Sequence, residues 1–446
     1  MKVLQIRTRG IKNLDKDIVV SFSNLVVNEG VKNINALKGI YGYNGAGKSA
    51  FITSIELYKK LMIDRNYLLT QLNQHKLSKL INYSINEFFV EFVFYDDKNQ
   101  KRIYKHSLLL SLDDLEKRFY VAEEFFGFLV GRTINDEYSE IFSIRNGTLN
   151  IVSNVEDDVD EYYRSTFNQS NGNITLNSIF IRMLAVVTSK KGEHFDLGQI
   201  EDLLNLFVFS VSLNVYLLTE DRHEPRTIDP STLFKILKKV KDDDIQFIRN
   251  LQLLESGDEY EDLVRKEDLT KYKKEIKNQE AFIRIFKPEL LRLDLDEKKD
   301  DKVYHCRKVF DYGSDKKVDI EYESSGIKHL LKLHEYFQGY LRGQIVFIDE
   351  MDVNINSVYL CKLIEFLLGE GAGQLCFTSH NLETMNILKN SKASICAIGY
   401  ERNIDVWAKT GNKSPVKEYS KGEFDHSPFN VEPFDFYSAF DVTKDN

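Results

Sequence analysis

The stretch that most constrains this 446-residue chain is "GYNGAGKS", residues 42–49. It fits the pattern G-x-x-x-x-G-K-[ST], follows the apolar run "NALKGIY" and precedes "SAFITSIELYKKLM", in which apolar residues recur at helical spacing. Glycines let a backbone fold around phosphate groups with its N–H groups pointing inward, and a helix N-terminus adds partial positive charge. The order of strand, glycine turn and helix therefore predicts a phosphate-binding loop in an α/β fold.

The side chains of this loop predict a nucleotide bound together with a metal ion. We expect Lys48 to reach the β and γ phosphates of ATP and the Ser49 hydroxyl to hold Mg²⁺. The remaining nucleotide contacts are expected along the loop, at Gly42, Asn44, Gly45, Ala46 and Gly47.

A second strand end supplies the carboxylates that such a site needs. In "QIVFIDEMD" the apolar run Ile345–Ile348 ends in Asp349 and Glu350, and ligands bind at the carboxyl ends of strands in open sheets. We expect Asp349 to contact Mg²⁺ through water and Glu350 to act as general base on the attacking water. In "GQLCFTSHNLETM" the next strand ends at His380, which could contact the γ-phosphate, although a lone histidine is more often structural.

Bulk composition excludes several classes of protein. A net charge of −9 argues against a uniformly basic nucleic-acid binder, while a local DNA-binding patch stays open. The four cysteines form no C-x-x-C pair, and the start "MKVLQIRTRG" lacks the apolar core of a signal peptide, so a cytoplasmic protein is expected. The apolar stretch Leu206–Leu218 is shorter than the ~20 residues of a membrane span and predicts a buried helix; no membrane partner is expected.

Periodicity divides the chain into three parts. Residues 1–160 alternate like antiparallel strands, with Asn146-Gly147 and "DDKNQ" as hairpin turns. Residues 161–287 read as a helical insertion for dimerisation or partner binding. Residues 288–446 return to strands that alternate with helices, which is typical of a parallel sheet. A short strand is expected at the start of "IEYESSGIKHLLKL", followed by a helix after Gly326.

Four segments occur in the order found in ABC-type ATPases: residues 42–49, "ESSGIKHL", "VFIDEMD" and "TSHN". The chain resembles the SMC/RecF-like branch of these proteins. It is more closely similar to the OLD-like AAA family ATPases of prokaryotic anti-phage and abortive-infection loci, including Septu PtuA-like proteins. The C-terminal run "SKGEFDHSPFNVEPFDF" also resembles the tail of that family.

The resemblance implies an ABC-type head with a mixed sheet and an antiparallel lobe. It makes Ser324, Ser325 and Gly326 the signature motif, with Ser325 in place of the first glycine of L-S-G-G-Q, and it puts Asp352 at the D-loop position. In ABC ATPases the signature turn completes the ATP site of a second subunit, so a homodimer or higher homo-oligomer is implied. The resemblance further implies a sensor or scaffold that controls a nuclease or toxin effector encoded nearby.

Alternative readings remain open from the sequence. A DNA-repair ATPase that clamps duplex DNA would lose affinity steeply with salt, at a slope near −0.9 per phosphate contact. A ring-forming AAA+ motor would need an arginine finger and a lid in place of the Ser325-Gly326 turn. No glutamine can be assigned to a Q-loop, for which Gln71, Gln74 and Gln100 are candidates.

Overall fold

The fold is described from a computed structural model of the whole chain. The residues it describes are 1–23, 36–64, 66–96, 102–152, 157–170, 173–187, 201–218, 260–300, 303–313, 317–391, 393–399, 404–407 and 413–423. The expected "DDKNQ" turn and Gln100 lie largely or wholly outside these residues, as does the C-terminal run from residue 424.

The centre of the molecule is a six-stranded sheet in the order β17-β16-β3-β15-β14-β9. All neighbours in it are parallel except β16 and β17. The five parallel strands are buried along their whole length, which explains their near-continuous apolar sequences. The strands are β3 (Leu37–Gly42), β9 (Leu213–Tyr216), β14 (Ile345–Ile348), β15 (Gln374–Thr378), β16 (Ile395–Ile398) and β17 (Ile404–Val406).

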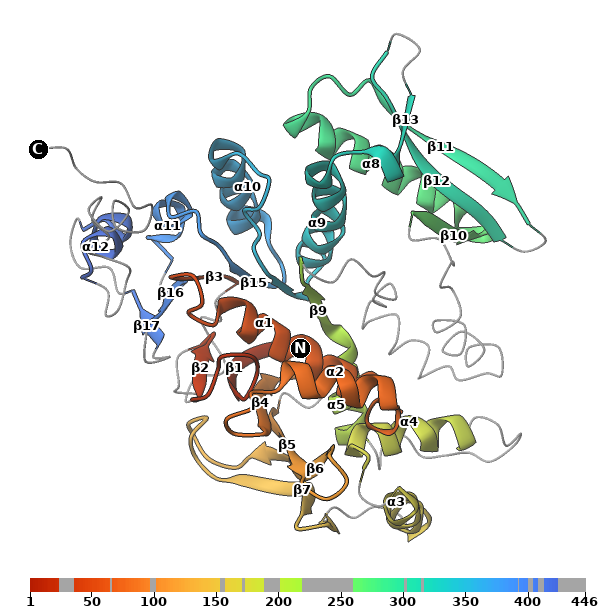
Figure 1. The fold of residues 1–446 in the computed structure, drawn as a ribbon, viewed down its shortest axis with the longest axis vertical. Coiled ribbons are helices and arrows are strands. Elements are labelled where there is room, and N and C mark those ends of the chain that lie inside the picture. Colours follow the sequence, from red (N-terminus) through yellow and green to blue (C-terminus); the bar gives the residue numbers. More distant parts are fainter. Residues whose placement is uncertain are drawn as a thin grey trace, which may run out of the picture.

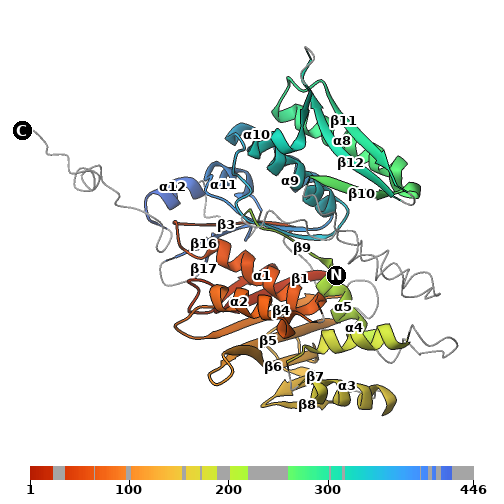
Figure 2. The same cartoon turned by 45° about the vertical axis from the view of Figure 1, so that its right-hand side comes forward.

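Helices cover both faces of this sheet (Figures 1 and 2). Side chains alternate along β14, so that Ile345 and Phe347 enter the core that contains α1, whereas Val346 and Ile348 enter the core on the opposite face. The first face carries α1 (Lys48–Ile63), α4 (Leu176–Val187) and α5 (Glu201–Ser212). The second carries α9 (Ser325–Leu341), α10 (Ser357–Glu370), α11 (Glu383–Leu388) and α12 (Pro415–Ser420).

A seven-stranded antiparallel sheet packs on the other side of α1 and confirms the antiparallel lobe expected in the front third. Asn146 and Gly147 both have positive φ and join β7 to β8, as the sequence predicts. Gln374, at the start of β15, makes two hydrogen bonds to the backbone of Val3 and so links the two sheets. In order, the strands are β2 (Ile18–Ser21), β1 (Lys2–Arg9), β4 (Glu87–Tyr95), β5 (Ile103–Asp113), β6 (Arg118–Leu129), β7 (Tyr138–Arg145) and β8 (Thr148–Ile151).

A small lobe projects beyond the start of α9 (Figure 1). It consists of α8 (Leu269–Phe286) packed against the antiparallel strands β10 (Glu261–Arg265), β12 (Val303–Asp311) and β11 (Arg292–Lys299), with β13 (Lys317–Asp319) paired to β12. The other helices among the described residues are α2 (Gln71–Leu80), α3 (Asp157–Gln169) and three-residue 3-10 turns, among them η4 (Ile320–Tyr322). We call α8 with β10–β13 the small lobe.

Three details differ from the sequence expectations. The segment 161–287 is not purely helical, because it contains β9 and β10. Leu206–Leu218 is not one helix: α5 ends at Ser212 and the chain continues as β9, whose backbone pairs with β14. Sheet pairing therefore overrides helical periodicity there.

The strand expected at the start of "IEYESSG" is the turn η4, and the strand lies just before it, in β13. Within the described residues, no helix is both long enough and apolar enough to cross a bilayer.

The fold class itself is as predicted. A glycine loop joins a buried parallel strand to a helix, the sheet is mixed, and an antiparallel lobe adjoins it. Since β15 lies between β3 and β14, the glycine loop and the acidic strand end are separated by one strand and open at the same edge of the sheet.

Candidate nucleotide site

The glycine loop crosses from β3 to α1 through conformations that favour glycine. Gly45 has φ +81° and Gly47 has φ +111°. A Cβ atom at Gly47 would lie 2.5 Å from Cδ2 of Leu14, whereas a Cβ at Gly45 would meet nothing within 4 Å. Asn44 and Gly45 are exposed and Ala46 is buried. The loop therefore packs against Leu14 at Gly47, whereas Asn44 and Gly45 are accessible to a ligand.

Lys48 begins α1 and points back across the loop. Its ammonium group donates hydrogen bonds to the carbonyl oxygens of Gly42 at 2.8 Å and Tyr43 at 3.1 Å, and the residue is 5% exposed. Burial lowers the pKa of Lys48, while the carboxylates of Asp349, Glu350 and Asp352 oppose that effect. The lysine therefore shares one electrostatic site with the acidic end of β14.

A segment between β1 and β2 also contacts the glycine loop, which the sequence did not suggest. The side-chain amide of Asn13 donates to the carbonyl of Gly45, and Leu14 packs under Gly47. Lys12, with φ +52°, donates to the Thr53 hydroxyl in α1 at 3.1 Å. Asn13 is thus positioned to fix the open part of the loop.

Thr378, at the end of β15, contacts both acidic residues that follow β14, one through its carboxylate and the other through its backbone. Its hydroxyl donates to Oδ1 of Asp349 at 2.6 Å and accepts from the backbone N–H of Glu350 at 2.7 Å. Asp349 is 5% exposed, whereas Glu350 is more exposed. Glu350 has φ +50°, a region that non-glycine residues rarely adopt and that often accompanies functional sites. The backbone turns there, so that the two adjacent carboxylates have different environments.

Asp352 and His380 meet at the same edge. Both carboxylate oxygens of Asp352 lie within hydrogen-bond distance of the backbone N–H of His380, at 3.1 and 3.3 Å. The neighbouring side chain of Asn381 donates to the Ser357 hydroxyl at 2.8 Å. The imidazole of His380 is exposed at the end of β15. The structure therefore brings together Lys48, Asp349, Glu350, Asp352 and the position of His380.

The serine turn, residues 324–326, lies on the opposite face of the main sheet from α1 (Figure 2). Ser324 caps α9, because its hydroxyl accepts from the N–H of Ile327 at 3.3 Å. Ser324 and Ser325 are exposed. A Cβ at Gly326 would lie 3.2 Å from Cβ of Asn354, so the turn adjoins the segment that follows Asp352.

The donor set fits a magnesium-bound nucleotide. The loop offers backbone groups beside a helix N-terminus, Lys48 offers a cation, and the Ser49 hydroxyl and Asp349 carboxylate offer the oxygen ligands that Mg²⁺ takes. Gln74, one Q-loop candidate, is instead buried, and its amide bonds to the backbone of Leu68 and Phe119 at 2.7–3.0 Å. That contact indicates a structural role for Gln74.

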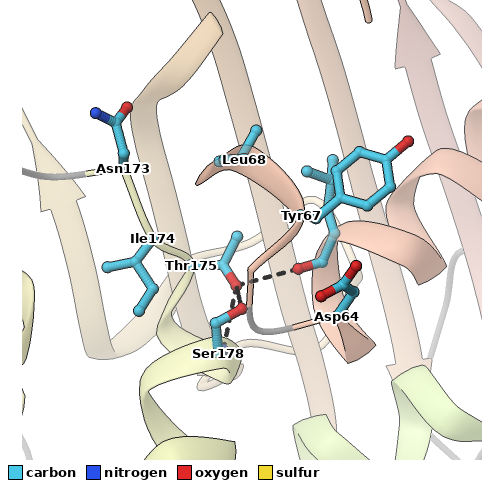
Figure 3. Close-up of a pocket in the computed structure, with 8 residues that line it drawn as sticks. Asp64, Tyr67, Leu68, Asn173, Ile174, Thr175 and Ser178 are labelled. Atoms are coloured by element: carbon cyan, nitrogen blue, oxygen red, sulfur yellow. Dashed lines mark hydrogen bonds between the residues drawn. The ribbon is translucent and has the colours of Figure 1, made fainter. Parts of the chain in front are cut away.

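A small hollow lies elsewhere, at the C-terminal end of α1 (Figure 3). The hydroxyl groups of Thr175 and Ser178 bond to each other there at 2.9 Å, and Asp64, Tyr67 and Asn173 complete its polar lining. Because a helix rises 1.5 Å per residue, this hollow is about 20 Å from Lys48. It is no part of the candidate site.

Comparisons with known proteins found no matching family model and no matching curated protein. Among solved structures, an SMC head bound to the C-terminal winged-helix domain of ScpA is 10% identical, with a TM-score of 0.45, and 92% of this chain and 98% of that one are covered. An SMC head from Pyrococcus furiosus with an extended coiled coil, bound to the C-terminal domain of ScpA, is 14% identical with a TM-score of 0.43 (91% and 96% covered). The SMC head from Thermotoga maritima is 12% identical with a TM-score of 0.33 (92% and 100% covered).

Proposed function

We propose that this chain is a magnesium-dependent ATPase of the ABC type, which binds ATP on the glycine loop and hydrolyses it to ADP and phosphate. The observation that carries the proposal is the convergence of Lys48, from the start of α1, with Asp349 and Glu350, from the end of β14, at one edge of the main sheet. A lysine with a purely structural role, or an acidic pair that merely follows a strand, would not explain why the two lie together.

Each residue has a distinct part in the proposed reaction. Lys48 exchanges the carbonyls of Gly42 and Tyr43 for phosphate oxygens. Ser49 and Asp349 would hold the magnesium ion, which would supply positive charge opposite the phosphate oxygens. Glu350 lies on the exposed side of the bend and accepts a proton from the attacking water. His380 lies two residues beyond the end of β15, where it would contact the terminal phosphate.

The decisive experiment is nucleotide binding by Lys48→Ala. Removing a charge-assisted contact worth about 1.5–3 kcal/mol weakens binding roughly 10–100-fold. Isothermal titration with a slowly hydrolysed ATP analogue and Mg²⁺ measures it. Lys79→Ala, on the exposed surface of α2, is the matched control and should bind as wild type does. Equal affinity in Lys48→Ala and wild type would remove the glycine loop from the site.

We further propose that two copies share their ATP sites, with the serine turn of one facing the glycine loop of the other. The exposed hydroxyl groups of Ser324 and Ser325, beside the segment that follows Asp352, support this arrangement. The family resemblance supports the biological role: a cytoplasmic sensor or scaffold that controls a nuclease or toxin effector in anti-phage defence. Phage plaque counts on cells carrying the chain with its neighbouring genes, wild type against Glu350→Gln, test that role.

The alternative role is a clamp on duplex DNA. Arginines on the outer face of β1 do not favour it, because Arg7 pairs with Asp17, and Arg9 lies 3.4 Å from both Asp17 and Glu87. Affinity for a duplex measured between 50 and 200 mM salt separates the two roles. If the logarithm of the association constant falls by several units per tenfold increase in salt concentration, the result would support the clamp and count against a protein scaffold.

A further inference from the structure

The residue directly before the serine turn is a buried carboxylate held from three directions. Glu323 is 8% exposed, although the serines that follow it are exposed. Its Oε1 accepts a hydrogen bond from the Tyr312 hydroxyl, and its Oε2 accepts from the N–H of Ser324 at 3.0 Å. The ammonium group of Lys287 lies 3.7 Å from the same Oε2. Burial of a carboxylate is costly unless it is paired and hydrogen-bonded, as this one is.

The partners of Glu323 come from the small lobe. Tyr312 directly follows β12, and Lys287 directly follows α8. The Lys287 ammonium also lies over the Tyr312 ring, 4.3 Å from its centroid, so the two partners hold each other as well. We call Lys287, Tyr312 and Glu323 the lobe clamp. It links the ends of one helix and one strand of the small lobe, through Glu323, to Ser324, the first residue of the serine turn.

A second set of contacts fixes the chain just upstream. Arg307, on β12, makes a two-pronged pair with Asp319 at 3.0 and 3.1 Å and also reaches Glu321 at 3.1 Å. Lys328, in the first turn of α9, donates to the carbonyl of Glu321 at 2.7 Å. The path from β13 through η4 into α9 is therefore determined by the small lobe, and Glu323 is its last fixed point before the exposed serines.

We infer that the lobe clamp positions the serine turn for catalysis in the partner's ATP site, and that Glu323 is the positioning residue through which the small lobe acts. The inference rests on the proposed function. A geometric error of about 1 Å in a group that contacts the reacting phosphate can cost as much as 100-fold in rate, so the clamp controls turnover without touching nucleotide. Any protein that binds the small lobe and displaces Tyr312 from Glu323 would slow hydrolysis.

The test compares Glu323→Gln and Tyr312→Phe with wild type. Glu323→Gln removes the charge opposite Lys287, and Tyr312→Phe removes only the hydroxyl. Both should lower ATP turnover about tenfold or more while leaving affinity for the ATP analogue unchanged, because the glycine loop is untouched. Glu116→Gln, an exposed carboxylate between β5 and β6, is the matched control and should behave as wild type.

Two further readouts separate positioning from a general loss of structure. Amide hydrogen exchange in a peptide covering residues 323–328 should be about tenfold faster in both variants, with unchanged exchange in the main sheet. Mixing Glu323→Gln with Lys48→Ala chains should restore turnover, since one composite site then has an intact loop and an intact turn. Unchanged exchange, or no restoration at any ratio, would overturn the inference.

The outcomes also distinguish this inference from the proposed function. A wild-type chain with no ATP turnover at any concentration would contradict the proposed function and remove the catalytic role of the clamp with it. Normal turnover in wild type and an equal rate in Glu323→Gln would contradict the inference alone.

Discussion

Thr378 shows how one hydroxyl group can set the chemistry of two neighbours. It donates to the buried Asp349 and accepts from the N–H of Glu350, at the point where the backbone of Glu350 takes a positive φ. Both Thr378 and Asp349 are almost fully buried. The hydroxyl therefore orients the carboxylate that we assign to magnesium and holds the bend that exposes the proposed general base.

Thr378→Val keeps the shape of the side chain and removes both hydrogen bonds. The loss leaves a buried carboxylate oxygen and an N–H group without this partner, so the free energy of unfolding should fall by about 1–3 kcal/mol. Urea denaturation followed by circular dichroism measures the change. Thr378→Ser retains the hydroxyl and should lose much less stability. If the serine and valine variants were equally unstable, the hydroxyl would not be the cause.

Glu350→Gln tests the proposed base directly. The amide cannot accept the proton of the attacking water, so turnover should fall by about 10²–10⁴-fold while ATP is still bound. Single-turnover phosphate release, with analogue affinity measured in parallel, makes the comparison. Asp349→Asn is expected to differ, since it should weaken the magnesium dependence of binding. Normal turnover in Glu350→Gln would place the base on another residue.

At the scale of elements, α9 carries two buried histidines on the face that packs against the main sheet and α8. His329 bonds to the Tyr216 hydroxyl through Nδ1 at 2.7 Å, and His334 lies against the ring of Phe282. Burial lowers the pKa of His329 to about 4, with a further contribution from Lys332 and an opposing one from Asp352. Burial, followed by Arg342, likewise lowers the pKa of His334 to about 4.

These histidines predict a loss of stability in mild acid. Below pH 6.5 an unfolded histidine binds a proton, whereas the folded ones stay neutral until about pH 4. The unfolded state thus binds more protons in this window, so the free energy of unfolding falls as the pH drops, by about 2 kcal/mol per histidine between pH 7 and pH 5. Denaturation of His329→Gln at both values should show a smaller loss than wild type. His75→Gln, on the exposed surface of α2, should show the full loss.

The sequence predicted those elements whose signal is local. The glycine loop, the acidic end of β14 and the Asn146-Gly147 turn are each determined by residues adjacent in the chain, and all three were found where expected. Asn13 and Thr378 were missed because their contacts join segments that are distant in sequence, and neither polar residue stands out in its own segment. β9 was missed because four residues after an apolar helix become a strand only through pairing with β14.

At the scale of the whole molecule, α1 lies between two sheets while the serine turn lies beyond the second face of the main sheet. One chain therefore presents its glycine loop and its serine turn on different sides. We expect each to be completed by another copy, which makes activity depend on protein concentration. The roles of Ser324, Ser325 and Gly326 depend on that arrangement.

Mixing two inactive chains tests it. Lys48→Ala lacks a working glycine loop. Gly326→Asp adds a carboxylate to the serine turn, at a position where a Cβ atom would lie only 3.2 Å from Cβ of Asn354. A mixed dimer contains one site with both parts intact, so an equimolar mixture should regain about a quarter of wild-type turnover if the chains associate at random. The phosphate release rate against mixing ratio gives the result. Absence of activity at all ratios would indicate that each chain carries a complete site.

Lys48 has two carbonyl partners within its own loop. A bound triphosphate would replace these carbonyl oxygens with phosphate oxygens as partners of the ammonium group. The affinity gained there is therefore the difference between two similar interaction energies. When product leaves, the ammonium group can return to the same two carbonyls, so the loop can keep its shape between turnovers.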